Sequence, residues 1–162
     1  MKLGLSNIAL TQYTHDSELM YVRDLGFSGL EVAPSRVWPD TWHGLKGSAV
    51  KKYLKLIERA GLKVIGLHSL FYDQKSLGLF AEGEERFKTL DFLVHLSSIC
   101  RDLGGTTMIY GGGRWRGGLP ENLARKLTID FVSELIPRIE GHGTTLCFEP
   151  LGTRDSDFVN SI

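Results

Sequence analysis

One glutamate stands where an α/β protein usually places its chemistry. Glu149 closes a short apolar, β-prone run that begins at Thr144, and Pro150 follows it at once. Substrates of such folds gather at the carboxyl ends of parallel strands, so a carboxylate at a strand end is a candidate base or metal ligand. The alternative is a solvated glutamate that is only the first polar residue after a buried strand.

Other expected strand ends also carry polar groups. His68 could orient a substrate hydroxyl or be a hydrogen-bonded structural histidine, and Glu31 could contact substrate or a neighbouring loop. Arg114 and Arg116, in a glycine-rich loop, could grip a phosphate or carboxylate, or be solvated charges. His15, His43, His95 and His142 show no ligand spacing and are expected to be surface or capping residues.

Aromatic residues gather in the loops expected after strands. Such rings often stack on sugar faces, and they equally often cover the end of a fold. We count Trp115 as a candidate substrate-binding residue. The full set is Trp38, Trp42, Phe71, Tyr72 and Trp115.

The elements that must position these residues are marked by glycine. Four times a helix-like segment ends at Gly and a strand follows, within residues 25–32, 60–68, 103–110 and 141–149. Glycine enters the left-handed region without a Cβ clash, which suits a helix C-terminus that turns back into a parallel strand. Apolar spacing of three and four predicts the helices between these corners. We expect helices at 17–25, 49–60 (N-cap Ser48), 84–103 and 121–140 (kinked near Pro137), an opening strand at 2–10, and the start of a fifth helix at 155–162.

Alternating strands and helices imply parallel strands, and two architectures compete. A five-stranded, doubly wound, flavodoxin-like sheet would want a phosphate-binding loop after the first strand, but residues 11–16 lack glycine and carry an acid. A (β/α)8 barrel needs about 200 residues or more, so this chain would supply five of eight strands. Side-chain alternation groups Glu149 with Cys147 and Thr145, and His68 with Gly66 and Val64. Small residues that precede a polar residue on the same face of a strand suit the crowded interior of a barrel, so this pattern favours the barrel.

Composition adds bounds on function. The chain of 162 residues is expected to form a single domain, 1–162, and 42% of its residues are hydrophobic. Nineteen basic residues balance nineteen acidic ones, so we expect neither nucleic acid nor an anionic membrane as a partner. Two cysteines without a disulfide pattern suit a reducing cytoplasm, and no apolar run approaches the ~20 residues of a membrane span.

The strand-end motifs resemble a known family. The stretch 29–34, the His68 strand end and, above all, the stretch 142–150 are similar to the xylose isomerase-like TIM barrels, which include sugar isomerases and epimerases and the endonuclease IV type of repair enzyme. The resemblance covers the N-terminal five-eighths of that fold. Many relatives have Gly-Ser-Pro and a basic residue after the fourth strand, whereas this chain has Gly111–Arg116.

The resemblance implies a sugar or sugar-phosphate isomerase or epimerase with a divalent metal, Mn²⁺, Mg²⁺, Co²⁺ or Zn²⁺, at the carboxyl face. Glu149 matches the first metal ligand and would also move a proton through an enediolate. The second glutamate comes from an eighth strand, so metal binding by this chain is expected to be weak. The alternatives are a non-catalytic or truncated barrel whose open edges self-associate, and, less favoured by the neutral charge, a metal-dependent phosphodiesterase of the endonuclease IV type.

Overall fold

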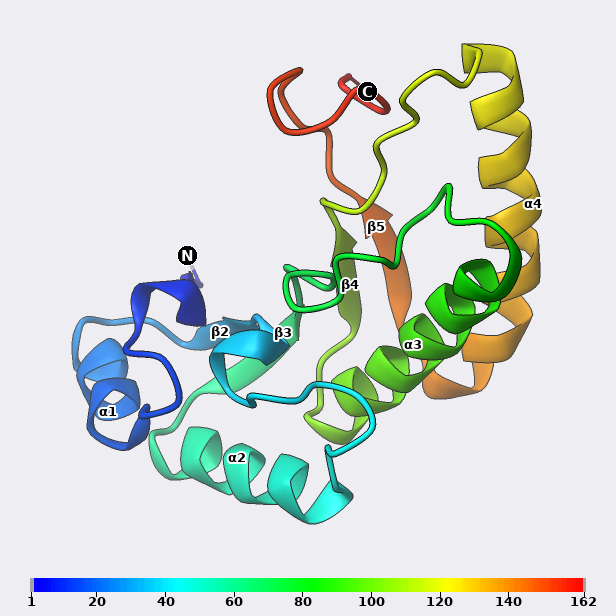
Figure 1. Ribbon diagram of the computed structural model, residues 1–162. Coiled ribbons are helices and arrows are strands. Elements are labelled where there is room, and N and C mark those ends of the chain that lie inside the picture. The colour runs from blue at the N-terminus through cyan, green and yellow to red at the C-terminus, as the bar shows by residue number, and fades with distance from the viewer. Residues whose placement is uncertain (1, 162) are drawn as a thin grey trace.

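The computed structural model describes residues 2–161, which form one five-stranded parallel sheet covered by four helices (Figure 1). The strands are β1 (Gly4–Ser6), β2 (Gly29–Val32), β3 (Lys63–Leu67), β4 (Thr107–Tyr110) and β5 (Thr145–Phe148). The helices are α1 (Asp16–Asp24), α2 (Gly47–Arg59), α3 (Gly83–Asp102) and α4 (Glu121–Ile139), with 3-10 turns η1 (Asn7–Ala9), η2 (Pro34–Arg36) and η3 (Glu140–His142).

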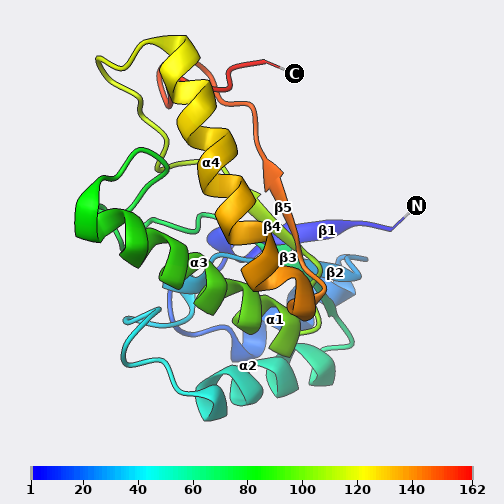
Figure 2. The ribbon, with the colours of Figure 1, turned by 90° about the vertical axis from the view of Figure 1, so that its right-hand side faces the viewer.

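The strand order decides between the two architectures. The strands pair in the order β1-β2-β3-β4-β5 and every pair is parallel, whereas a flavodoxin-like sheet places β1 between β2 and β3. Figure 2 shows the four helices on one side of a strongly twisted sheet. Each helix contacts the next, α1 to α2, α2 to α3 and α3 to α4, so the chain winds in one direction as in a barrel.

The predicted glycine corners are present. Gly26, Gly61 and Gly104 adopt φ values of +91°, +71° and +79°, and Gly143 adopts +69°. The first three close their helices with the paired hydrogen bonds of a Schellman motif. At the end of α1, the Gly26 N–H donates to Arg23 O and the Phe27 N–H to Val22 O. At each of these glycines the chain reverses direction after a helix and enters the next parallel strand.

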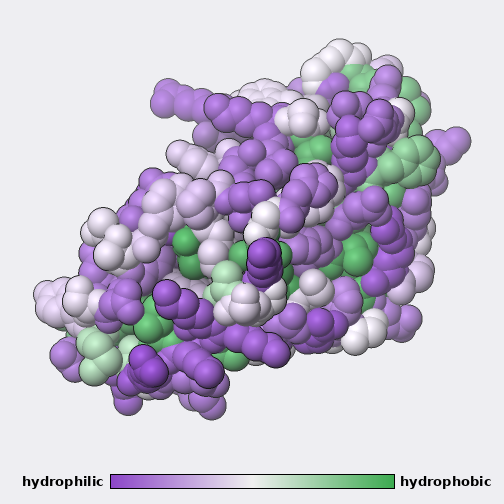
Figure 3. All heavy atoms as spheres, turned by 60° about the horizontal axis from the view of Figure 1, so that its bottom comes forward, coloured by the Kyte–Doolittle hydropathy of each residue, from purple (hydrophilic) through white to green (hydrophobic). Residues whose placement is uncertain are grey.

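The core lies between the sheet and the helices. The side chains of Leu30, Leu67 and Met108 are 0% exposed on the helix-facing side of the strands. They pack against fully buried residues of α3, such as Leu93 and Leu96. None of the helices formed by residues 2–161 combines the length and the hydrophobicity that a membrane span requires. Figure 3 shows the face that carries α2 and α3, where hydrophilic side chains dominate and hydrophobic ones appear in separate areas.

Three local predictions were wrong. The opening strand covers only Gly4–Ser6 because the Ser6 hydroxyl then accepts the Ile8 N–H and the chain enters η1. Helix α2 starts one residue before Ser48, with Lys46 as an N-cap that makes no side-chain bond. The expected helix at 155–162, of which Ile162 lies outside the described residues, is absent over 155–161, where a turn ending at Asp155 is followed by a bend and irregular chain. There Val159 has φ +57°, which a right-handed helix does not allow.

One predicted face was also partly wrong. Leu30 pairs with Val64 but Glu31 pairs with Gly66, so Ile65 is an extra residue, a bulge, on β3. The bulge turns the Val64 side chain toward the helices, where it is 8% exposed in the core. Ile65 is left 39% exposed on the opposite side of the sheet, which we call the inner face. Val64 therefore does not share the face of His68. Gly66 does lie below His68, and its missing side chain lets β3 approach Thr107 of β4.

Candidate active site at the carboxyl ends of the strands

The inner face of the sheet ends in three of the predicted site residues. Glu31 of β2 pairs in register with Ser6 and with Gly66, and His68 and Glu149 each follow the last residue of a strand, β3 and β5. Parallel strands end at one edge, so these side chains share the same rim. His68 also lies near enough to Glu31 and Glu149 to be affected by both charges.

His68 is fixed by two hydroxyl groups. Its Nε2 lies 2.8 Å from Ser6 Oγ and its Nδ1 lies 3.2 Å from Ser69 Oγ. Burial lowers the pKa of His68, and Glu31 and Glu149 oppose this shift. The ring is therefore neutral at pH 7. Ser69 itself has φ +51°, an uncommon value for a residue with a side chain, directly beside the histidine.

Glu149 is held through its main chain and is free at its carboxylate. Its N–H donates to Tyr110 O at 3.2 Å, and its carbonyl oxygen accepts a hydrogen bond from Arg114 Nη2. The side chain is exposed, and its carboxylate oxygens accept no hydrogen bond from any residue within 2–161. A carboxylate in this state is available to a substrate hydrogen or to a cation.

The predicted arginines are engaged with the protein itself. Arg114 is 1% exposed, and its guanidinium group donates to three main-chain carbonyl oxygens. Arg116 donates to the carbonyl oxygens of Asp157 and Leu119. Sequence reasoning missed these partners because Asp157 and Val159 lie more than 40 residues away along the chain.

The aromatic residues divide into buried and exposed ones. Trp38 and Phe71 belong to the core, with exposures of 7% and 8%. Trp42 is partly buried and stacks on His43 with a ring separation of 4.3 Å. Tyr72 and Trp115 are 72% and 55% exposed in the loops that follow β3 and β4. Of the predicted aromatic contacts, these two rings are open to a ligand.

The described residues offer part of a metal site. Among residues 2–161, no three side chains of His, Cys, Asp or Glu converge as a metal ion would require. Glu149 supplies one free carboxylate, and oxygen donors of this kind suit hard divalent cations. The residues present therefore fit one ligand of a divalent metal and do not fit a complete site.

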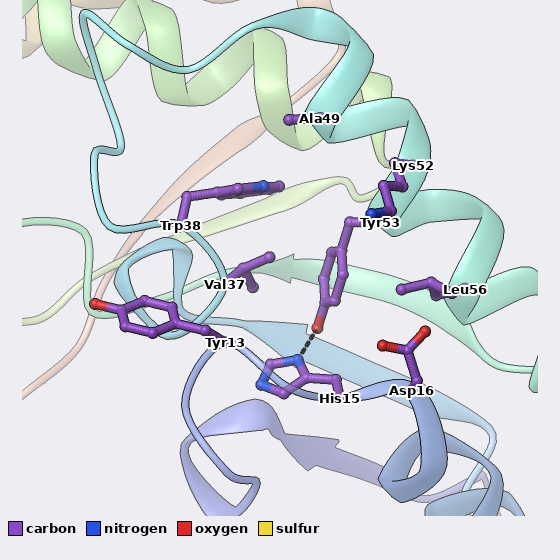
Figure 4. A pocket seen from close by; sticks show the side chains of 9 residues that line it. All are labelled: Tyr13, His15, Asp16, Val37, Trp38, Ala49, Lys52, Tyr53 and Leu56. Atoms are coloured by element: carbon purple, nitrogen blue, oxygen red, sulfur yellow. Dashed lines mark hydrogen bonds between the residues drawn. The ribbon is translucent and has the colours of Figure 1, made fainter.

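A hollow in the surface lies away from this rim. A hollow of about 250 Å³ lies between α1 and α2 under the loops after β1 and β2 (Figure 4). His15 is 3% exposed there, so it is not a surface residue. It stands at the N-cap position of α1, as one of the two predictions had it, but its side chain makes no capping bond and its Nδ1 instead lies 2.7 Å from the Tyr53 hydroxyl oxygen. Glu31, His68 and Glu149 do not line this hollow.

Comparison with known proteins agrees with the geometry. The sequence profile of the family described as xylose isomerase-like TIM barrel matches residues 19–162, and the chain belongs to this family. No curated protein matches the chain. The parallel sheet with its one-directional strand order is thus the fold of a family member.

Solved structures show the same fold at low sequence identity. The D-psicose 3-epimerase of Clostridium cellulolyticum superposes with a TM-score of 0.76 and 16% identity over 99% of this chain and 56% of its own. The 3-keto-D-glucoside 4-epimerase of E. coli superposes with a TM-score of 0.73 and 18% identity, over 94% of this chain and 57% of its own. A sugar phosphate isomerase/epimerase of Parabacteroides distasonis superposes with a TM-score of 0.66 and 22% identity, over 91% of this chain and 53% of its own. The chain spans little more than half of each structure, so the sheet is a partial barrel.

Proposed function

We propose that this chain carries the proton-transfer carboxylate of a sugar or sugar-phosphate isomerase or epimerase, and that this carboxylate is Glu149. The observation behind the proposal is the free carboxylate at the end of β5, on the rim that also holds Glu31 and His68. The epimerases and isomerases among the solved neighbours support the reaction class. Epimerisation or isomerisation of a keto sugar can proceed by moving a hydrogen on a carbon next to the carbonyl group.

Glu149 would act as a general base in this reaction. Its carboxylate takes the proton from the carbon beside the carbonyl, the electron pair of the broken C–H bond forms a C=C bond, and the π pair of the C=O bond moves to the oxygen. Return of the proton to the opposite face of the same carbon gives an epimer. Return to the former carbonyl carbon, together with transfer of the hydroxyl proton from the neighbouring oxygen to the former carbonyl oxygen, gives an isomer. In both cases one C–H bond breaks and one forms, so no redox partner is needed.

A divalent cation would assist this step as a Lewis acid by polarising the carbonyl oxygen. Glu149 would be one of its ligands, and residues 2–161 do not supply a set of three such ligands. We therefore expect Mn²⁺ binding by this chain to be weak. The chain's own contribution is to hold Glu149 in place and to keep its carboxylate free of protein hydrogen bonds.

The remaining rim residues would bind the sugar. Neutral His68 exchanges its longer bond, the 3.2 Å contact with Ser69, for a substrate hydroxyl. Glu31 accepts a hydroxyl hydrogen, and the exposed ring of Trp115 covers a sugar face.

The two free cysteines, Cys100 and Cys147, suit a cytoplasmic setting.

The test is Mn²⁺ binding measured by calorimetry or electron paramagnetic resonance, together with solvent deuterium exchange into a ketohexose followed by NMR. We expect Glu149→Gln to abolish both signals, because the amide neither ligates a hard cation well nor accepts the proton. Glu82→Gln is the matched control, since Glu82 is exposed and makes no cap hydrogen bond. Mn²⁺ binding by Glu149→Gln equal to that of the wild type would remove Glu149 from the site.

We also propose that a second copy covers the open side of the sheet. Strands β1 and β5 are the edges of the described sheet, and Ile65 is 39% exposed on its inner face. Unpaired strand edges and apolar inner surface favour association. Light scattering should report a dimer or larger assembly at micromolar concentration. A monomer under those conditions would contradict this part of the proposal.

A further inference from the structure

Arg114 joins three separate parts of the chain at the rim. Its Nε donates to Gly111 O at 2.6 Å, its Nη1 to Val159 O at 3.3 Å, and its Nη2 to Glu149 O. The first acceptor belongs to the loop after β4, the second to the segment near residue 160, and the third to the end of β5. One buried guanidinium group thus fixes the main chain of Glu149 against the neighbouring loop.

Arg116 makes a parallel connection from the same loop. Its N–H donates to Asp157 Oδ1 at 2.7 Å, its Nε to Asp157 O at 3.1 Å and its Nη1 to Leu119 O at 2.7 Å. The segment 149–160 is therefore attached to the β4–α4 loop at Glu149, Asp157 and Val159. Within 149–160, Asn160 Nδ2 also donates to Leu151 O at 2.8 Å.

The shape of the guanidinium group is essential to this arrangement. Its donors form a rigid planar fork, so three of its nitrogens reach three carbonyl oxygens at once, whereas lysine has one nitrogen. Donors already engaged with these main-chain oxygens are not free for a phosphate or carboxylate of a substrate. One acceptor, Val159, is a β-branched residue at φ +57°, a strained conformation that its bond to Arg114 helps to hold.

Gly111 completes the arrangement on the side of the carboxylate. A Cβ atom at Gly111 would lie 2.6 Å from Glu149 Oε2, so the missing side chain leaves the space that the carboxylate occupies. The φ of Gly111 is not positive, so its backbone accepts alanine without strain. Gly112, the next residue, has nothing within 4 Å of its Cβ position and serves as a matched control.

We propose that Arg114 is a positioning residue for Glu149, acting with the space left by Gly111, and that it is not a ligand for an anionic substrate. Arg114 fixes the main chain at the end of β5, and the absence of a side chain at Gly111 leaves room for the Glu149 carboxylate. This inference rests on the proposed function only in naming Glu149 as the reacting group. The geometry that it describes can be measured without turnover.

The first experiment is hydrogen-deuterium exchange on the full chain with Arg114→Lys. We expect the peptide covering 149–160 to exchange about tenfold faster or more, while peptides from α2 and β3 keep their wild-type rates. Arg101→Lys is the control, since Arg101 is exposed and its guanidinium group bonds Asp102 of its own helix, α3. Unchanged exchange in 149–160 would overturn the proposal, as would an equal increase over the whole chain.

The second experiment follows the carboxylate itself by NMR. In protein labelled with ¹³C-glutamate, the Glu149 Cδ signal is assigned by its loss in Glu149→Gln. Gly111→Ala should move this signal and Gly112→Ala should not. An unmoved signal in Gly111→Ala would overturn the role of Gly111, and this test remains available if Arg114→Lys fails to fold.

Inorganic phosphate separates the positioning role from anion binding. Phosphate should leave the exchange of 149–160 unchanged in the wild type. Protection by phosphate that is lost in Arg114→Lys would identify Arg114 as an anion ligand and overturn the proposal. Failure of the wild type to bind Mn²⁺ would count against the proposed function alone, because neither the exchange rates nor the Cδ signal depends on metal.

Discussion

The close approach of β3 to β4 gives a sharp prediction for Gly66→Ala. A Cβ atom at Gly66 would lie 2.2 Å from Thr107 O and 2.8 Å from Thr107 C, and both atoms belong to the main chain. A rotamer change of the Thr107 side chain cannot relieve this contact, so the two strands must separate by about 0.8 Å to bring the shorter distance to 3.0 Å. The pair Gly66–Thr107 is one of the two residue pairs that join β3 to β4.

The expected loss of stability follows from overpacking. Inserting a methyl group into a packed site costs about 1–3 kcal/mol, and an obstacle made of backbone favours the upper end, about 3 kcal/mol. For a chain of this size the melting temperature should fall by about 6–12 °C. The measurement is urea unfolding followed by circular dichroism, with an unchanged m-value required for the comparison.

A matched substitution separates crowding from the general effect of glycine replacement. Gly141 has nothing within 4 Å of its Cβ position, so Gly141→Ala should change stability by less than about 1 kcal/mol and in the stabilising direction. If Gly66→Ala unfolds within about 0.5 kcal/mol of the wild type, β3 and β4 do not pack as described. The reasoning about the inner face would then be wrong.

Two further predictions concern the buried His15–Tyr53 pair. Tyr53→Phe should lower the free energy of unfolding in urea by about 1–3 kcal/mol. His15 Nε2 already has no partner among the described residues, and its Nδ1 would lose the Tyr53 hydroxyl group. A change near zero would show that the pair is not stabilising. Burial lowers the pKa of His15, so the unfolded chain takes up the proton more readily, and stability should be constant above about pH 6.5 and decline as the pH falls through that value. His15→Gln should make the decline shallower, and an identical pH profile would assign it to other groups, such as His68 and His95, whose pKa values burial also lowers.

The candidate site shows how far sequence reasoning reaches. Glu149, His68 and Glu31 could be found because a polar residue after a β-prone run marks a strand end, and parallel strands bring their ends to one edge. The role of Arg114 could not be found in this way. A glycine-rich loop with arginines looks the same whether the guanidinium groups face a ligand or the carbonyl oxygens of residues 149 and 159.

The sequence by itself determined the local units of this protein. Glycine at each corner permits the left-handed turn that ends a helix, and apolar spacing sets the helices, so both are properties of neighbouring residues. The tertiary structure alone decided the strand order, the bulge at Ile65, the burial of His15 and the partners of Arg114. Each of these depends on which distant segments pack together, and that choice is made by the free energy of the whole core rather than by any short stretch of sequence.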